Sequence, residues 1–183
     1  TLSMPAASIV SLWRLDMSGA VVGILVWAVG ISIKKDGGQA IFVQTDVSQE
    51  DQVMAMVDKT KNTFGRINIL FSNAGIMIPK SVTDITAEEW DHLMKVNVRS
   101  AFLCCKYIIP IMKESGGGSV IIDSSVNAIM AEPNIAAYCT SKGALGSLTR
   151  SMAMDYGKDN IRVNCIYPGW IETPLNADYF AEP

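Results

Sequence analysis

The sequence predicts a single α/β domain in which a parallel sheet carries helices on both faces. Its 183 residues can form one good hydrophobic core but are too few for two. Hydrophobic residues make up 49% and charged residues 18%, which is typical of a globular protein with a buried sheet. From Gln39 onward, strand-like and helix-like segments alternate, as they do when right-handed helical crossovers join parallel strands.

Four short apolar runs are the predicted strands, and each lies next to a turn signal. They are Gln39–Gln44, Ile67–Phe71, Val120–Asp123 and Arg162–Ile166. The third follows a glycine turn at Gly116–Gly118, and the last leads to Pro168–Gly169. Open parallel sheets bind ligands beyond the carboxyl ends of their strands, so functional residues are expected directly after these runs.

Helix signals fill the intervals between the predicted strands. Ser48 with Asp51, and Thr86 with Glu89, resemble capping boxes, and the first of these helices should stop near Gly65. A further helix is predicted through Asn97 to about Lys113, with Pro110 bending or weakening its end. The longest predicted helix is Ala136–Tyr156.

Composition excludes several classes of function. A formal charge of −3 gives no general attraction to nucleic acid or anionic membranes. The four cysteines form no CxxC pair, and we interpret them as reduced thiols of a cytoplasmic protein. The single histidine, His92, rules out a histidine-rich metal site and is expected on a solvated helix face, and we predict no metal site.

The run Gly19–Ile33 is nearly all apolar and is followed by Lys34 and Lys35. It is shorter than the roughly 18 residues of a spanning helix, and it does not resemble a signal peptide. A buried strand or helix is therefore favoured over the alternative, a membrane anchor.

Tyr138 and Lys142 carry the strongest chemical signal. Residues four apart lie on one face of a helix. A free tyrosine has a pKa near 10, and a nearby ammonium favours the phenolate, so we expect Lys142 to lower the pKa of Tyr138. Such a pair can give and take a proton, although YxxxK alone also fits a surface tyrosine beside a solvated lysine.

Residues after three predicted strands support the functional interpretation. Ser125 follows Val120–Asp123, and Asn73–Gly75 follows Ile67–Phe71. Pro168–Gly169 follows the last strand. Together they bring small or hydroxyl-bearing residues to one edge of the sheet.

The order and spacing of these motifs closely resemble the short-chain dehydrogenase/reductase family of the compact type. The motifs are NAG at Asn73–Gly75, Asn97 in VNVRSAF, Ser125 in DSSVNA, YCTSK at Tyr138–Lys142, and RVNCIYPGWIET. The resemblance implies a Rossmann-like doubly wound parallel sheet. It also implies hydride transfer between a nicotinamide cofactor and a secondary alcohol or ketone.

The resemblance also implies roles for individual residues. Tyr138 would be the general acid in reduction and the base in oxidation. Lys142 would lower the pKa of Tyr138 and bind the nicotinamide ribose. Ser125, or less favourably Ser124, would polarise the substrate oxygen, and Asn97 would position a water in a proton relay.

Further positions correspond to the family's cofactor groove. Either NAD or NADP would fit, with a slight preference for NAD. The implied cofactor-binding residues are Asp46, Val47, Asn73, Ala74, Gly75, Tyr138, Lys142, Pro168, Gly169, Ile171 and Thr173.

The resemblance covers about Gln39–Thr173, within a single domain of residues 1–183. Residues 1–36 are atypical, since only Ser18–Leu25 resembles the family's glycine-rich turn, and Leu25 replaces its last glycine. We therefore expect an incomplete fold, with a degenerate first strand–helix unit and no C-terminal strand. The alternative function is an inactive remnant that serves as a binding or oligomerisation module. The resemblance also implies a homodimer or homotetramer that acts on a small alcohol or carbonyl compound.

Overall fold

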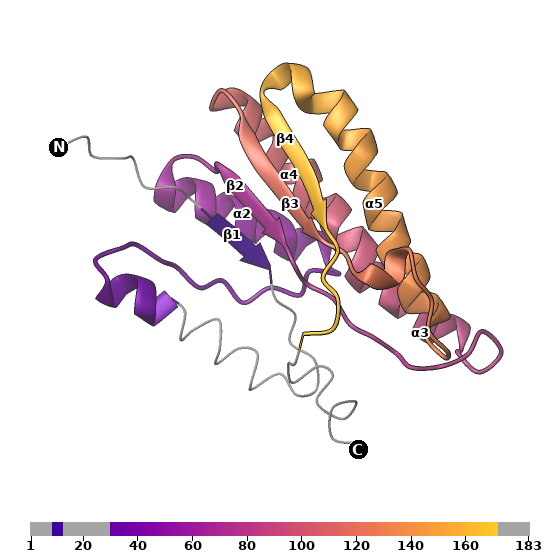
Figure 1. Ribbon diagram of the computed structural model, residues 1–183. Coiled ribbons are helices and arrows are strands. Elements are labelled where there is room, and N and C mark those ends of the chain that lie inside the picture. The colour runs from indigo at the N-terminus through magenta and orange to yellow at the C-terminus, as the bar shows by residue number, and fades with distance from the viewer. Residues whose placement is uncertain (1–8, 13–29, 172–183) are drawn as a thin grey trace.

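The computed structural model describes residues 9–12 and 30–171 (Figure 1). Its centre is a four-stranded sheet of β1 (Ile9–Leu12), β2 (Ile69–Ser72), β3 (Gly118–Asp123) and β4 (Ile161–Ile166), in that spatial order. Every neighbouring pair is parallel. The predicted α/β class and parallel sheet are confirmed.

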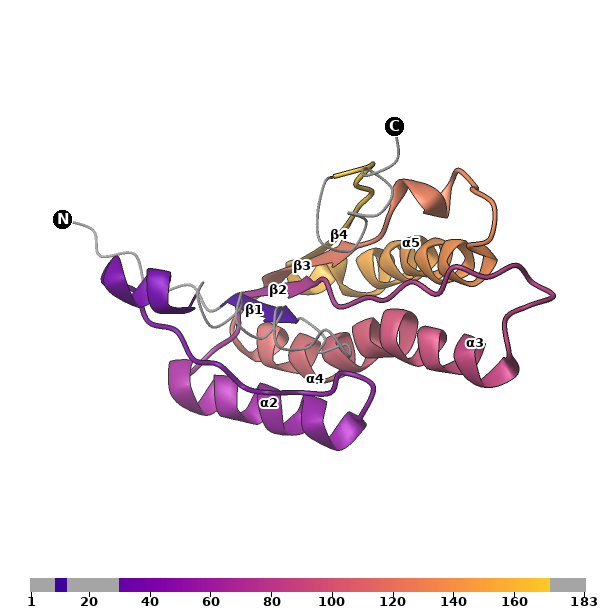
Figure 2. The same cartoon turned by 90° about the horizontal axis from the view of Figure 1, so that it is seen from below.

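The long described helices cover one face of this sheet. They are α2 (Glu50–Phe64), α4 (Ser100–Glu114) and α5 (Ala136–Tyr156), and α3 (Ala87–Met94) precedes α4. Successive strands add in one direction, and right-handed crossovers then bring the connecting helices to the same side (Figure 2). The predicted Rossmann-like fold, incomplete in this chain, is confirmed, and the three long helices of the described residues form the layer on one of its faces.

Local signals in the sequence define two of the helix ends. Thr86 and Glu89 form the predicted capping box at the start of α3. Gly65 ends α2 in the left-handed conformation, with φ 79°, as a residue without Cβ can do without strain. The Ser48 cap is wrong: α2 starts after Gln49, and the Ser48 hydroxyl donates to Asp46 Oδ1 instead.

Two strand assignments differ from the sequence prediction. Residues 39–44 form no strand, and the Phe42 side chain is 50% exposed. In contrast, Ile9–Leu12, within the segment predicted to be atypical, forms β1 and pairs with Ile69–Ser72. Strand formation needs a hydrogen-bonding neighbour. Among the described residues β1 has one in β2, whereas residues 39–44 have none.

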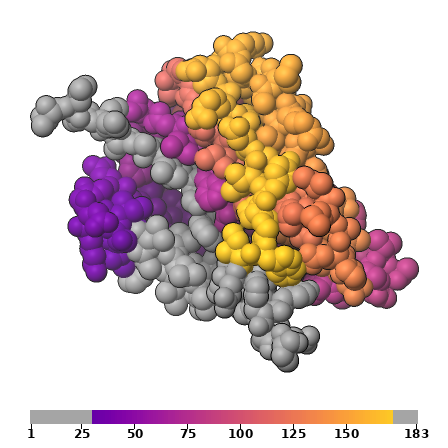
Figure 3. Space-filling view, viewed as in Figure 1, coloured from indigo at the N-terminus to yellow at the C-terminus, as the bar shows by residue number. Residues whose placement is uncertain are grey.

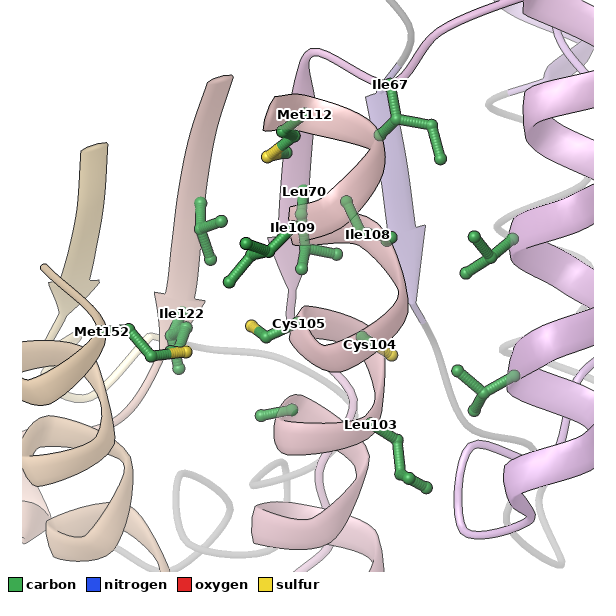
Figure 4. Close-up of a cluster of buried hydrophobic side chains, with 14 of the residues drawn as sticks. Ile67, Leu70, Leu103, Cys104, Cys105, Ile108, Ile109, Met112, Ile122 and Met152 are labelled. Carbon is green, nitrogen blue, oxygen red and sulfur yellow. The ribbon is translucent and has the colours of Figure 1, made fainter. Parts of the chain in front are cut away.

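The core lies between the strands and the helical layer. Alternate strand side chains face the helices, including Leu70, Val120 and Ile122, all fully buried. They pack against α4, and Met152 of α5 points toward Ile122 (Figure 4). Pro110 does not end α4, which continues to Glu114.

Replacing Ile108, which is fully buried on α4, should leave a cavity in this core. We expect Ile108→Ala to lower the free energy of unfolding by about 2–5 kcal/mol in denaturant titration. The matched control is Ile129→Ala, where the side chain is 79% exposed and little should change. Equal effects of the two substitutions would contradict this assignment of the core.

Candidate active site

Three strand ends and one helix meet at the carboxyl edge of the sheet. Ser72 pairs with Ile122 on β3, and Asp123 pairs with Ile166 on β4, so the segments that follow these strands emerge side by side. Two backbone bonds join them: Ser124 N–H donates to Ile166 O over 2.9 Å, and Val126 N–H donates to Pro168 O over 2.9 Å. Figure 3 shows the segment after β4, in yellow, beside the orange loop after β3.

Lys142 is an almost fully buried ammonium, 4% exposed, on the inner face of α5. Its Nζ donates to the Asp123 carbonyl oxygen over 2.9 Å and lies 5.6 Å from the centre of the Tyr138 ring. Burial lowers the pKa of Lys142, and the Asp123 carboxylate opposes that shift. The two residues of the YxxxK motif are therefore together, as their spacing predicts.

The pKa of Tyr138 moves opposite to our expectation. Burial of the phenol raises this pKa, and the Asp123 carboxylate adds to the rise, while a hydrogen bond with the Ser125 hydroxyl lowers it. Desolvation penalises the phenolate, and the Lys142 ammonium is directed at a carbonyl oxygen. The predicted lowering of the Tyr138 pKa by Lys142 is therefore wrong.

The two serines after β3 have different partners. Ser124 is buried, and its hydroxyl donates to the Lys142 carbonyl oxygen over 2.7 Å, so it fastens the strand end to α5. Ser125 instead lies near Tyr138, whose pKa it lowers, and caps the short helix η2 (Val126–Ala128) by accepting from Asn127 N–H over 3.1 Å. This geometry favours Ser125 as the hydroxyl that meets a substrate.

Asn97 lies in a π-helical turn, η1 (Lys95–Arg99), between α3 and α4. Its carboxamide accepts from Ile76 N–H over 2.8 Å and donates to Ile76 O over 2.9 Å and to Ser141 Oγ over 3.0 Å. The side chain is 1% exposed, so these bonds connect the segment after β2 to α5 in a buried setting. Turns of this kind occur often at functional sites.

Gly75 brings the backbone close to both groups. A Cβ placed on Gly75 would lie 3.5 Å from Lys142 Nζ and 3.6 Å from Asn97 Oδ1. The ammonium carries three N–H donors, and the Asp123 carbonyl accepts one. This donor set fits the ribose hydroxyls of a nicotinamide nucleotide.

The other predicted cofactor residues lie around the same edge or outside the described range. Val47 is fully buried in the core, so only its backbone is available to a ligand, and Asp46 Oδ1 already accepts from the Ser48 hydroxyl. Thr173 lies outside the described residues. Those near the edge are Asn73 and Ala74 after β2, and Pro168, Gly169 and Ile171 after β4.

Sequence reasoning missed four residues of this edge: Asp123, Asn127, Glu132 and Ser141. Ser141 lies inside YCTSK, where the spacing to Lys142 gives no hint of its bond to Asn97. Asn127 is hydrogen-bonded to both Ser125 and Glu132. These bonds depend on the path of the loop after β3, which the sequence does not reveal.

Neither a metal cluster nor a membrane-spanning helix occurs among the described residues. No group of three or more histidine, cysteine, aspartate or glutamate side chains there could hold a metal ion. None of the helices in that part of the chain is long and apolar enough to cross a bilayer. Most of Gly19–Ile33 lies outside the described range.

Comparison with known proteins identifies the family. A family model described as enoyl-(acyl carrier protein) reductase matches residues 28–182, and the chain belongs to the short-chain dehydrogenase/reductase family. The match begins before Gln39, where the motifs become recognisable. An uncharacterised oxidoreductase of Bacillus subtilis is 43% identical over 145 residues, which are 79% of this chain and 53% of that protein.

Two solved structures have the same fold with a bound cofactor. One is a gluconate 5-dehydrogenase from Burkholderia cenocepacia with NADP and tartrate, with TM-score 0.82, 28% identity and coverage of 94% of this chain and 65% of that one. The other is NAD⁺-bound xylitol dehydrogenase, with TM-score 0.82, 29% identity and coverage of 94% and 64%. The chain spans 53% to 60% of the length of curated relatives.

Asn97→Ala should destabilise the protein, because it leaves the buried Ile76 N–H and C=O groups without their partner. We expect a loss of about 2–4 kcal/mol in the free energy of unfolding, measured by denaturant titration. Asn62→Ala, on an exposed position of α2, is the control and should change it by less than about 0.5 kcal/mol. A loss no larger than that of the control would refute the role of Asn97 as a bridge.

Proposed function

We propose that this chain catalyses nicotinamide-dependent oxidation of secondary alcohols and reduction of ketones, with Tyr138 as the acid–base group. The observation that carries this proposal is a single geometry. The Ser125 hydroxyl lies close enough to the Tyr138 phenol to lower its pKa, and the Lys142 ammonium lies 5.6 Å from the centre of the Tyr138 ring. Membership of the short-chain dehydrogenase/reductase family supports the same reaction class.

The substrate oxygen would lie between Ser125 and Tyr138. In reduction, Tyr138 Oη gives its proton to the carbonyl oxygen as that oxygen gains charge, and Ser125 donates a hydrogen bond to it. In oxidation, the Tyr138 phenolate removes the alcohol proton. Asn97 fixes α5, which carries Tyr138, against the end of β2.

Lys142 would hold the nicotinamide ribose, and the backbone around Asn73–Gly75 would line the adenosine side. Pro168, Gly169 and Ile171 would border the nicotinamide. When bound, the nicotinamide would supply or accept the hydride. The related structures hold NADP in one case and NAD⁺ in the other, and our slight preference for NAD remains a proposal.

We also infer self-association and a cytoplasmic location. All four cysteines are free thiols, and two of them are buried, which favours a reducing compartment. Phe102 on α4 is 47% exposed and Met154 on α5 is 85% exposed, so both helices offer apolar side chains to a second copy.

Tyr138→Phe should abolish turnover while leaving cofactor binding intact, because it removes one hydroxyl and no charge from the cofactor side. We expect turnover to fall by about 10²-fold to 10⁴-fold. Turnover is measured through nicotinamide absorbance with NADH or NADPH and a panel of ketones. The control is Tyr156→Phe at the other end of the same helix, which should keep full activity.

The inactive-remnant alternative makes a different prediction. Calorimetric titration of the full chain with NAD and NADP would then give no binding. Absence of both binding and turnover, or turnover that survives Tyr138→Phe, would overturn the proposed function.

The pH profile should follow the raised pKa of Tyr138. Because this pKa lies above its ordinary value near 10, little phenolate exists at neutral pH, and alcohol oxidation should accelerate as the pH rises. Ketone reduction uses the neutral phenol, so its rate should stay level and then fall as the pH approaches this pKa. Initial rates in both directions across the alkaline range test this, and an oxidation rate independent of pH would contradict it.

A further inference from the structure

The loop after β3 links three polar side chains into a short chain of hydrogen bonds. Ser125 Oγ donates to Asn127 Oδ1 over 3.2 Å, and Asn127 Nδ2 donates to Glu132 Oε1 over 3.1 Å. Asn127 and Glu132 are both half-buried. The carboxylate is therefore held on the loop that starts at the candidate catalytic serine.

The Glu132 carboxylate acts on the candidate acid–base group. Its charge raises the pKa of Tyr138, as the charge of Asp123 does. Cys139 is a third group that raises this pKa, and the Lys142 ammonium donates to the Asp123 carbonyl oxygen. A substrate that reaches Ser125 and Tyr138 would meet a negative potential from the side of the loop.

We propose that Glu132, held by Asn127, selects the substrate by charge. The site would accept neutral or cationic alcohols with a second hydrogen-bond donor next to the reacting carbinol, and it would disfavour alcohols with a carboxylate there. A hydroxyl or ammonium group can donate to the Glu132 oxygens, whereas a carboxylate repels them. This inference rests on the proposed oxidoreductase function, because it names the substrate class of the same site.

Glu132 could instead serve only as a brace that closes the loop through Asn127. Glu132→Gln separates the two roles, because glutamine keeps an oxygen that can accept from Asn127 Nδ2 and removes only the charge. The matched control is Glu114→Gln, since Glu114 is an exposed carboxylate at the end of α4 whose partner is Lys61.

The test uses three alcohols that differ only in the group beside the carbinol: propylene glycol, isopropanolamine and lactate. With the full chain and NAD or NADP, the wild type should have a lower kcat/KM for lactate than for the other two. Glu132→Gln should raise the lactate-to-glycol ratio about a hundredfold, as expected for two unit charges on the order of 6 Å apart near a protein surface. It should lower the isopropanolamine-to-glycol ratio, and Glu114→Gln should change neither ratio.

If Glu132→Gln oxidises these alcohols with the same lactate-to-glycol and isopropanolamine-to-glycol ratios as the wild type, selection by charge is overturned. The proposed function would then still stand. Absence of turnover with all three alcohols and with ketones would count against the proposed function instead. A second measurement then decides on Glu132: ultraviolet titration of the tyrosinate, taken as the difference from Tyr138→Phe. Removing the carboxylate should lower the titration midpoint of Tyr138, and an unmoved midpoint would refute the inference.

Discussion

The buried carboxamide of Asn97 holds together the two parts of the chain on which the candidate site depends. Three hydrogen bonds join it to Ile76, which follows β2, and to Ser141, which lies on α5. Both partners are remote in sequence, so these bonds oppose a large loss of chain entropy and act only within a formed core. Because the first turns of α5 carry Tyr138 and Lys142, the position of this carboxamide sets where phenol and ammonium meet the strand ends.

Burial then sets the electrostatics of the pair. It raises the pKa of Tyr138 and lowers that of Lys142, so the same low-dielectric surroundings favour the neutral form of each group. The interaction of any further charge with the phenol is strengthened by the same desolvation. For this reason carboxylates as different in position as Asp123 and Glu132 both affect the pKa of Tyr138. The loop after β3 thus affects the pKa of Tyr138 through Glu132.

Signals that act within a few residues predicted much of this arrangement. Features that depend on contacts between distant residues could not be predicted from the sequence. The helix Ala136–Tyr156 was predicted to the residue, and so was the capping box at Thr86, because caps and helical periodicity act within a few residues. The strand Gln39–Gln44 was wrong and β1 was missed, because strand formation depends on a neighbour that sequence patterns do not name. The direction of the Tyr138 pKa shift failed for a similar reason: spacing places a lysine beside a phenol, but only the packed core reveals how much water both have lost.

The proposed acid–base group and the proposed substrate-selecting group belong to separate parts of the chain. Tyr138, the proposed acid–base group, is fixed by contacts inside the core, through Asn97 and through Ser124, whose hydroxyl donates to the α5 backbone. The candidate selecting group belongs to the loop of residues 126–135, where Ile129 and Met130 are 79% and 64% exposed and contribute little to the core. Substitutions in such a loop alter few buried contacts, so charge and shape can change there at small cost in stability. The charge beside the proposed site can therefore change through this loop while the contacts that hold Tyr138 and Lys142 stay the same.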